Sequence, residues 1–440
     1  MTDCRLMLSV SQRALERLGT EDFLWRVPPA GSSFHTTLGP RMGELGSVPP
    51  LHADFVRLAA LAYLVDRTVT RGRGVRRGTR WSRDLHLEVP VADPAPWEPL
   101  VDRLSVLLDF LTGDRWELAF RRRRLPRLGK TVAPSGSGPV LLFSGGADSL
   151  AGAILLREEH GQPPVLFSQW NWTTIGGIQN LLVRRLDNQW GTDVVHQQVQ
   201  LGRRDKQIGS GEAFGQEDSS RSRSILFIAL GLAAAAVRDT DLVIAENGFT
   251  SLNIPLGGER RGALSTRTTH PGFLDALAEI LQAVGLSVRL LTPFDGLTKG
   301  ALFGRVRDVL GTNPASELLS ESHSCAKPGA QYLGAGFSPA DQCGLCYGCL
   351  IRRAAFVAAD VVDRTDYVEA KLAGDPRRST WLDQGEKRSH AVAVAAAVAR
   401  GLRPADVLSL SLPSRVNRRA ALALAEAGLA ELSALDIDLS

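Results

Sequence analysis

One short run of residues constrains the fold of this chain more than any other. It reads Ser144-Gly145-Gly146-Ala147-Asp148-Ser149, and it stands between two apolar stretches, residues 139–143 and residues 150–156. A buried strand, a tight turn and a helix would produce this order, because glycine lets the backbone turn sharply and approach a ligand closely. The run therefore predicts an α/β unit with a ligand-binding turn between strand and helix.

The chemistry of this turn suits a phosphate group. It opens onto a helix N-terminus, where free N–H groups and the helix dipole favour an anion. Ser144 and Ser149 add hydroxyl donors, and Asp148 offers a carboxylate to a divalent cation. A Walker A loop would need a lysine before its last Ser or Thr, and none stands here. We predict a phosphate-binding loop over residues 144–149, and the alternative is a plain glycine-rich turn.

A second signal is the spacing of the cysteines near residue 340. Four of the five cysteines in the chain are Cys325, Cys343, Cys346 and Cys349. Two thiolates separated by two residues can bind one metal, and four make a closed, tetrahedral zinc site. The alternative is a cluster of buried, inert cysteines, which would have no reason to recur at three-residue intervals. We expect these four residues to hold Zn²⁺ and Cys4 to remain a free thiol.

The loop and the cysteines together carry a resemblance to known enzymes. Ser-Gly-Gly-x-Asp-Ser after a strand is similar to the loop of the PP-loop ATP pyrophosphatases, which cleave ATP between its α and β phosphates. With the cysteine pattern added, the chain resembles 7-cyano-7-deazaguanine synthase, the ATP-dependent enzyme of queuosine biosynthesis. Residues 223–228 resemble a helix start of that family, and Thr292-Pro293 with Lys299 resembles its Thr-Pro-…-Lys segment. The resemblance covers roughly residues 136–360.

The resemblance implies a fold, a reaction and a set of site residues. The fold would be a doubly wound, parallel five-stranded sheet of the HUP/PP-loop type, with strand order 3-2-1-4-5. A 7-carboxy-7-deazaguanine would attack the α-phosphate of ATP, and an amine would then displace AMP from the acyl-adenylate. ATP, Mg²⁺ and Zn²⁺ are the implied cofactors. Asp148, Arg223 and Lys299 are the expected catalytic residues, with the arginine and the lysine facing the triphosphate.

Other parts of the chain depart from the pattern of the housekeeping enzyme. About 135 residues precede the central segment, and residues 326–342 form a longer insertion after the first cysteine of the cluster. An extended branch of the family is found in anti-phage defence operons, in the Qat systems and in type IV CBASS. Residues 66–69, 81–85 and 111–116 are similar to N-terminal sequence segments of that branch. The resemblance to that branch implies that the deazaguanine acid is joined to a protein amine. We therefore expect a partner protein encoded in the same operon.

Three alternatives to this function remain. The first is the housekeeping synthase, which would use ammonia and make the free nitrile. The second is a PP-loop enzyme that modifies tRNA, for example by thiolation, which would need an exposed catalytic cysteine. The third is a scaffold that keeps the fold without catalysis, against which the complete phosphate loop argues.

The resemblance, together with the order of the apolar segments, implies three parts. Residues 1–130 read as an α+β domain for partner docking, and residues 136–360 read as the PP-loop domain, with the cysteine site at 325–349. Residues 361–440 read as helices that pack on the core. In the central part strand and helix alternate, which is typical of a parallel sheet covered on both faces. Its predicted strands are 140–143, 165–168, 194–199, 242–245 and 288–291.

Composition and charge bound the class of protein. The chain has 440 residues, of which 44% are hydrophobic, and its longest apolar run, 225–237, is too short to span a bilayer. With no basic-then-apolar leader at the start, we expect a cytoplasmic enzyme without a membrane partner. The arginines of 71–80 and 121–124 are interpreted as solvated or edge-strand charges, so a nucleic-acid partner is not expected. A homodimer stays open.

Overall fold

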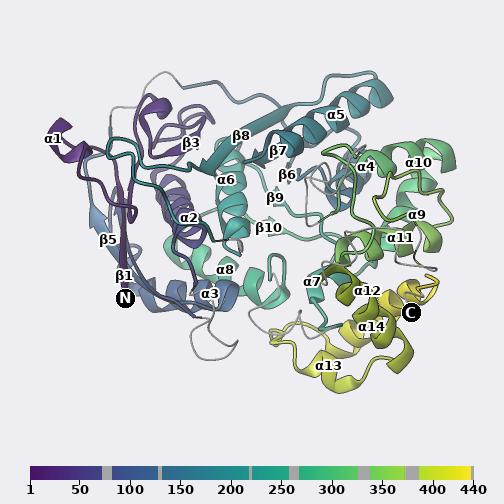
Figure 1. The fold of residues 1–440 in the computed structure, drawn as a ribbon. Coiled ribbons are helices and arrows are strands. Elements are labelled where there is room, and N and C mark those ends of the chain that lie inside the picture. Colours follow the sequence, from purple (N-terminus) through teal and green to yellow (C-terminus); the bar gives the residue numbers. More distant parts are fainter. Residues whose placement is uncertain are drawn as a thin grey trace.

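The computed structural model has two sheets with helices packed between them (Figure 1). Helix α2 (Pro50–Thr68) packs on the smaller sheet, helix α6 (Arg223–Ala236) packs on the larger one, and the two helices pack against each other. Their apolar side chains form one continuous core with strands of both sheets. The structure describes residues 1–71, 82–126, 131–217, 221–256, 267–325, 337–370, 372 and 386–437.

The larger sheet contains the strand that precedes the predicted phosphate loop. Five of its strands are parallel, and numbered along the chain from β6 they lie in the order 3-2-1-4-5, which confirms the expected order. The strands in spatial order are β10 (Leu290–Leu291), β9 (Leu242–Val243), β6 (Val140–Leu142), β7 (Val165–Trp170), β8 (His196–Arg203) and β3 (Phe34–Thr36).

Helices cover both faces of this sheet, as the prediction of a doubly wound fold requires. Val140 and Leu142 of β6 belong to the core shared with α6 and α8, whereas Leu141 packs into the core shared with α4 and α5. Successive residues of a strand face opposite sides, so a strand buried on both faces is a continuous apolar run. The bounds of the other three helices are α4 (Ala147–His160), α5 (Thr173–Trp190) and α8 (Pro271–Val284).

The prediction of five strands was wrong by one strand. The sixth, β3, comes from the N-terminal region and pairs antiparallel with β8, with Phe34 opposite Arg203 and Thr36 opposite Leu201. It covers the edge that β8 would otherwise expose, which is a common way to prevent sheets from associating edge to edge. A strand of three residues leaves almost no periodic signal in a sequence, and its partner lies more than 160 residues away.

The prediction of an α+β domain at the N-terminus was also wrong, because the smaller sheet is parallel throughout. Helices α2 and α3 each carry the chain back across the sheet, so successive strands run in the same direction. The strands in spatial order are β2 (Asp22–Leu24), β1 (Thr2–Met7), β4 (Asp84–Val91) and β5 (Arg115–Arg122), and the second crossover helix is α3 (Val101–Thr112).

The C-terminal helices pack on the central part, as expected (Figure 1, lower right). Their apolar side chains share a core with the four clustered cysteines. A Cβ atom on Gly428 would lie 2.2 Å from the ring of Phe249, so the contact requires glycine. The C-terminal helices are α12 (Glu386–Arg400), α13 (Pro404–Leu408) and α14 (Arg418–Ser433), and the central helices that they contact include α7 (Gly248–Leu252) and α11 (Tyr347–Ala358).

None of the described helices is long and apolar enough to cross a membrane. The predicted boundaries between the three parts of the chain stay predictions. The remaining elements are the helices α1 (Gln12–Leu15), α9 (Lys299–Leu310) and α10 (Thr312–Glu321) and the 3-10 helices η1 (Pro29–Gly31) and η2 (Glu98–Leu100).

Candidate nucleotide site and cysteine cluster

The predicted phosphate loop joins β6 to the N-terminus of α4. Gly145 has a φ of +85°, a left-handed conformation that favours glycine. The hydroxyl of Ser149 donates to the carbonyl of Gly146 at 2.9 Å and lies 3.3 Å from the hydroxyl of Ser144. No side chain caps the N-terminus of α4 at Gly146. The first amides of this helix therefore remain available to an anion.

Asp148, in the first turn of α4, is held by two residues from distant segments. The ammonium of Lys299 at the start of α9 lies 2.6 Å from its Oδ2, and the amide of Asn247 donates to its Oδ1 at 3.1 Å. All three side chains are buried. Asn247 follows β9 and also caps α7, because its Oδ1 accepts from the N–H of Thr250. Two of the three expected catalytic residues, Asp148 and Lys299, are thus in direct contact.

Glu246 is a site residue that was not among the expected catalytic residues. It follows β9, where side chains at the carboxyl ends of parallel strands meet a ligand. Desolvation within the fold, and next the negative charge of Asp148, raise the pKa of its carboxyl group to about 8, against the opposing charge of Lys299. Its place after a strand of the central sheet was the signal that could have found it.

A cavity of about 290 Å³ lies over the loop. It is lined by the loop, by the first turns of α6, by the end of β9 and by the segment around the cysteines. The polar residues that line it are Ser144, Asp148, Ser149, Ser224, Glu246, Thr250, Thr268, Thr269, Lys299, His323 and Ser324. The two signals of the sequence, loop and cysteine segment, therefore meet at one cavity.

Arg223, the third expected catalytic residue, lies apart from this group. Its Nε donates to Oε1 of Gln169 at the end of β7, at 3.3 Å, and Arg223 is not among the described residues that line the cavity. Desolvation lowers the pKa of its guanidinium. Its neighbour Ser224 does line the cavity. The contact of Arg223 with a triphosphate stays a prediction.

The start of α6 is capped by an acidic residue from the N-terminal region. Oδ2 of Asp66, near the end of α2, accepts from the backbone N–H groups of Arg221 and Ser222 at 2.8 and 2.9 Å, and from the Ser222 hydroxyl at 2.8 Å. Oδ1 of Asp66 accepts from Arg83 at 2.6 Å. The guanidinium of Arg83 also reaches Asp114. A buried ion network thus fixes a wall of the cavity.

Three N-terminal segments, 66–69, 81–85 and 111–116, carried the resemblance to the extended branch. The network contains one residue from each of them: Asp66, Arg83 and Asp114. Arg71, which was counted with a basic cluster, is buried and pairs with Asp114 at 2.5 Å. It is therefore a structural residue. The rest of that cluster lies outside the described residues. On β5 and just beyond it, Arg121 and Arg123 pair with Glu88 on the neighbouring strand.

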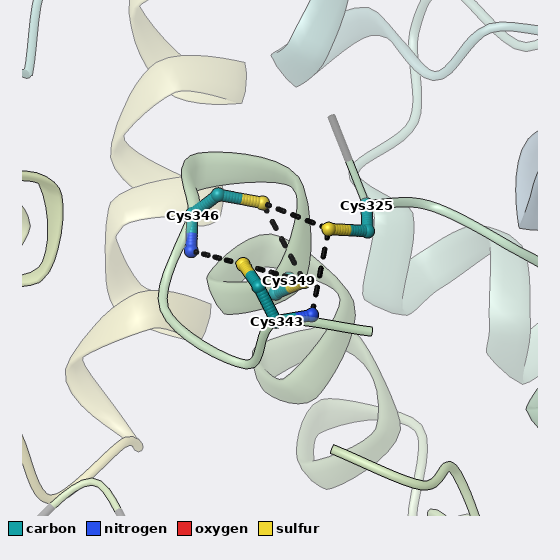
Figure 2. A group of neighbouring side chains, drawn as sticks. All are labelled: Cys325, Cys343, Cys346 and Cys349. Atoms are coloured by element: carbon teal, nitrogen blue, oxygen red, sulfur yellow. Dashed lines mark hydrogen bonds between the residues drawn. The ribbon is translucent and has the colours of Figure 1, made fainter. Parts of the chain in front are cut away.

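The four clustered cysteines converge, as predicted, at the N-terminus of α11 (Figure 2). The sulfurs of Cys343 and Cys349 are 3.8 Å apart, those of Cys346 and Cys349 3.5 Å, and those of Cys325 and Cys346 3.9 Å. Sulfurs about 2.3 Å from a tetrahedral Zn²⁺ lie about 3.8 Å from one another. All four are buried, and the N–H of Cys346 donates to the sulfur of Cys343. The group fits a closed structural zinc site.

The segment that leads into the cysteine cluster also supports the phosphate loop. The N–H of His323 donates to the carbonyl of Gly145 at 2.9 Å. On the other side, a Cβ atom on Gly348 would lie 2.4 Å from the carbonyl oxygen of Ser324, so α11 approaches this segment as closely as glycine allows. A metal that fixes the cysteines would therefore also fix the back of the loop.

Comparison with known proteins points to one family over part of the chain. No family model matches. The chain is 32% identical over 158 residues to the 7-cyano-7-deazaguanine synthase of Allorhizobium ampelinum, and 32% identical over 151 residues to that of Rhizobium etli. Each match covers 34% of this chain and 52% of the relative, so the chain spans about half the length of the curated relatives it matches.

These matches support a partial resemblance to 7-cyano-7-deazaguanine synthase, and they leave the extended defence branch a prediction.

Proposed function

We propose that this chain uses ATP to adenylate a carboxylated 7-deazaguanine and then transfers the acyl group to an amine. The observation that carries the proposal is the contact between Asp148 and Lys299 beside an uncapped helix N-terminus in a cavity. A buried lysine, a carboxylate and a glycine loop are the groups that hold a nucleoside triphosphate and its cation. The partial match to a synthase that acts on a deazaguanine supports the choice of substrate.

In the first step, an oxygen of the substrate carboxylate attacks the α-phosphorus of ATP, and the bond to the bridging oxygen of the β-phosphate breaks. Pyrophosphate leaves with the electron pair. The loop amides, the hydroxyls of Ser144 and Ser149, and Lys299 would stabilise the charge that develops on the phosphates. Asp148 would hold Mg²⁺, which supplies further charge stabilisation when bound.

In the second step, an amine attacks the acyl carbon and AMP is released. We propose that the amine belongs to a partner protein encoded in the same operon, in a system of anti-phage defence. The support is the N-terminal region, which the chemistry of the central sheet does not require, yet which is joined to the cavity wall through Asp66. Such a region could bind a partner and bring its amine to the acyl-adenylate, where proximity replaces a high ammonia concentration.

The main alternative is the housekeeping reaction, in which ammonia gives an amide and a second adenylation dehydrates it to the nitrile. The names of the curated relatives favour it. A thiolating tRNA enzyme is disfavoured, because all five cysteines are buried and four of them form the cluster. Burial raises the pKa of the fifth, Cys4, to about 12, so it is not a thiolate at neutral pH.

Co-expression with the operon neighbours, followed by mass spectrometry of the intact proteins, separates the two acceptors. We expect one neighbour to gain the mass of the deazaguanine acid minus water, and an Asp148→Asn variant to lose that gain. Efficient production of the nitrile from ammonia, with every neighbour unmodified, would assign the chain to the housekeeping reaction.

A further inference from the structure

A second cavity, of about 350 Å³, adjoins the first. Ile244, Glu246 and Thr269 line both cavities, so the carboxylate of Glu246 stands at the boundary between them. An occupant of the second cavity would approach the nucleotide cavity from the side of β9.

The second cavity is built by parts of the chain that are distant in sequence. One wall is formed by residues that follow β9 and β10, and a second by the start of α8. The third wall is the start of the C-terminal helix α14, with Asn417, Ala420, Ala421 and Leu424. Arg415, just before that helix, pairs with Asp275 of α8 and ties two of the walls together. The C-terminal region therefore completes a chamber.

The segments that line the second chamber pack closely against one another at Gly248. A Cβ atom on Gly248 would lie 1.8 Å from the carbonyl oxygen of Asp295 and 2.7 Å from Cδ2 of Leu424. Helix α14 is also anchored beside Lys299, because Glu431 accepts from the hydroxyl of Thr298 and, at 3.0 Å, from the N–H of Gly300. The same helix thus forms the chamber and supports the start of α9.

The lining of the chamber combines carboxylates with aliphatic side chains. Glu246 and Asp295 are its acidic residues, and its one basic residue among those described, Arg415, is paired with Asp275. Its apolar lining includes Leu252, Leu274 and Leu424. No aromatic side chain stands among the described residues that line it, whereas Phe227 and Tyr347 line the first cavity. A planar base therefore finds stacking partners only in the first cavity.

We propose that the second cavity binds the acyl acceptor, a primary amine carried on an apolar chain such as a peptide segment. The ammonium group would lie beside Asp295 and Glu246, its positive charge favouring the ionised form of the Glu246 carboxyl group, and the apolar part would lie against the leucines. This inference rests on the proposed function. In the transfer step the free amine nitrogen forms a bond to the acyl carbon, and the bond from that carbon to the AMP oxygen breaks. AMP leaves with the electron pair, and the surplus protons of the ammonium pass to water.

A substitution at the mouth of the cavity tests this assignment. Ala420 lines the cavity and is exposed, so Ala420→Trp would fill the mouth without entering the core. Ala423→Trp is the matched control, because Ala423 is exposed on the same helix and does not line the cavity. The probe is n-hexylamine, compared with ammonia, as acceptor for the acyl group of 7-carboxy-7-deazaguanine. Adenylation is followed separately, by exchange of pyrophosphate into ATP.

We expect the native protein to use hexylamine with a KM at least about tenfold below that for ammonia, because the apolar walls bind its chain. Ala420→Trp should raise the hexylamine KM about tenfold, with exchange unchanged, and Ala423→Trp should change neither. Equal use of both amines, or an unaffected Ala420→Trp variant, would overturn the assignment. So would a raised KM for the acid in place of the amine, which would assign the cavity to the deazaguanine. Absence of exchange in the native protein would instead refute the proposed function.

Discussion

Nζ of Lys299 lies 2.6 Å from Oδ2 of Asp148, although the two residues are 151 positions apart in the chain. Both side chains are buried. Among the residues that the structure describes, they form the only ion pair between the first turn of α4 and the start of α9. A buried pair of this kind holds two helix starts in register across the cavity. Removal of one member of the pair leaves the charge of the other unpaired in the interior.

The stability of the fold should therefore depend on both members of this pair together. We expect Lys299→Met to lower the free energy of unfolding by about 3–5 kcal/mol, because Asp148 stays buried without its cation. The double variant Lys299→Met with Asp148→Asn should recover a large part of that loss. Urea unfolding of the two single variants and the double variant measures the coupling. Strictly additive losses would show that the two side chains do not act as a pair.

The cysteine cluster should hold one Zn²⁺ per chain. We expect elemental analysis to find one equivalent in the native protein and in Cys4→Ala, whose thiol lies outside the cluster. Cys349→Ser should lose the metal and unfold at a markedly lower temperature, since structural zinc contributes directly to folding free energy. A gently purified native protein without zinc, or a Cys349→Ser variant that keeps it, would contradict the assignment.

Asp66 should govern the order of the first turn of α6. In Asp66→Asn the carboxylate that accepts three hydrogen bonds from Arg221 and Ser222 is replaced by a neutral amide. We expect a loss of about 3–5 kcal/mol of stability, as for other broken buried ion pairs, and faster amide hydrogen exchange at the start of α6. Glu279→Gln is the matched control, because it breaks an exposed pair with Arg103 and should cost less than about 1 kcal/mol. Equal protection of α6 in both variants would refute the capping role.

Acid should destabilise the protein through its buried histidines. Burial lowers the pKa of His52 to about 4, and neither of its ring nitrogens has a hydrogen-bond partner among the described residues. As the pH falls below about 6.5, the unfolded chain binds a proton that the folded chain refuses. The stabilisation present above pH 6.5 is therefore lost between pH 6.5 and 4. His52→Leu should reduce this slope by about 1.4 kcal/mol per pH unit, measured by urea unfolding.

His160→Gln serves as the control for the histidine measurement, because the side chain of His160 is exposed. An identical pH dependence in the native protein and in His52→Leu would contradict the prediction.

The sequence was most informative where the signal is local. The apolar run 140–142 and the glycines after it specified β6 and the loop, and the cysteine spacing specified the cluster, because each pattern lies within a few residues. The order of the five parallel strands came from the resemblance, and the pairing in the structure agrees with it.

The missed features all depend on contacts between distant segments. Strand β3 is short and becomes a strand only through its pairing with β8. The cap of α6 by Asp66 joins residues 155 positions apart, and no local sequence pattern indicates it. Glu246 acquires its role from the charges of Asp148 and Lys299, which the fold brings to it. A single sequence contains these residues but not their proximity.

The most direct test of this account is exchange of labelled pyrophosphate into ATP in the presence of 7-carboxy-7-deazaguanine. We predict exchange that requires the acid, and a loss of about a hundredfold or more in Ser144→Ala and in Asp148→Asn. Ser137→Ala, at an exposed position before the loop, should keep native exchange. No exchange in the native protein with this acid, or native exchange in both loop variants, would contradict the proposal that this loop adenylates a deazaguanine acid.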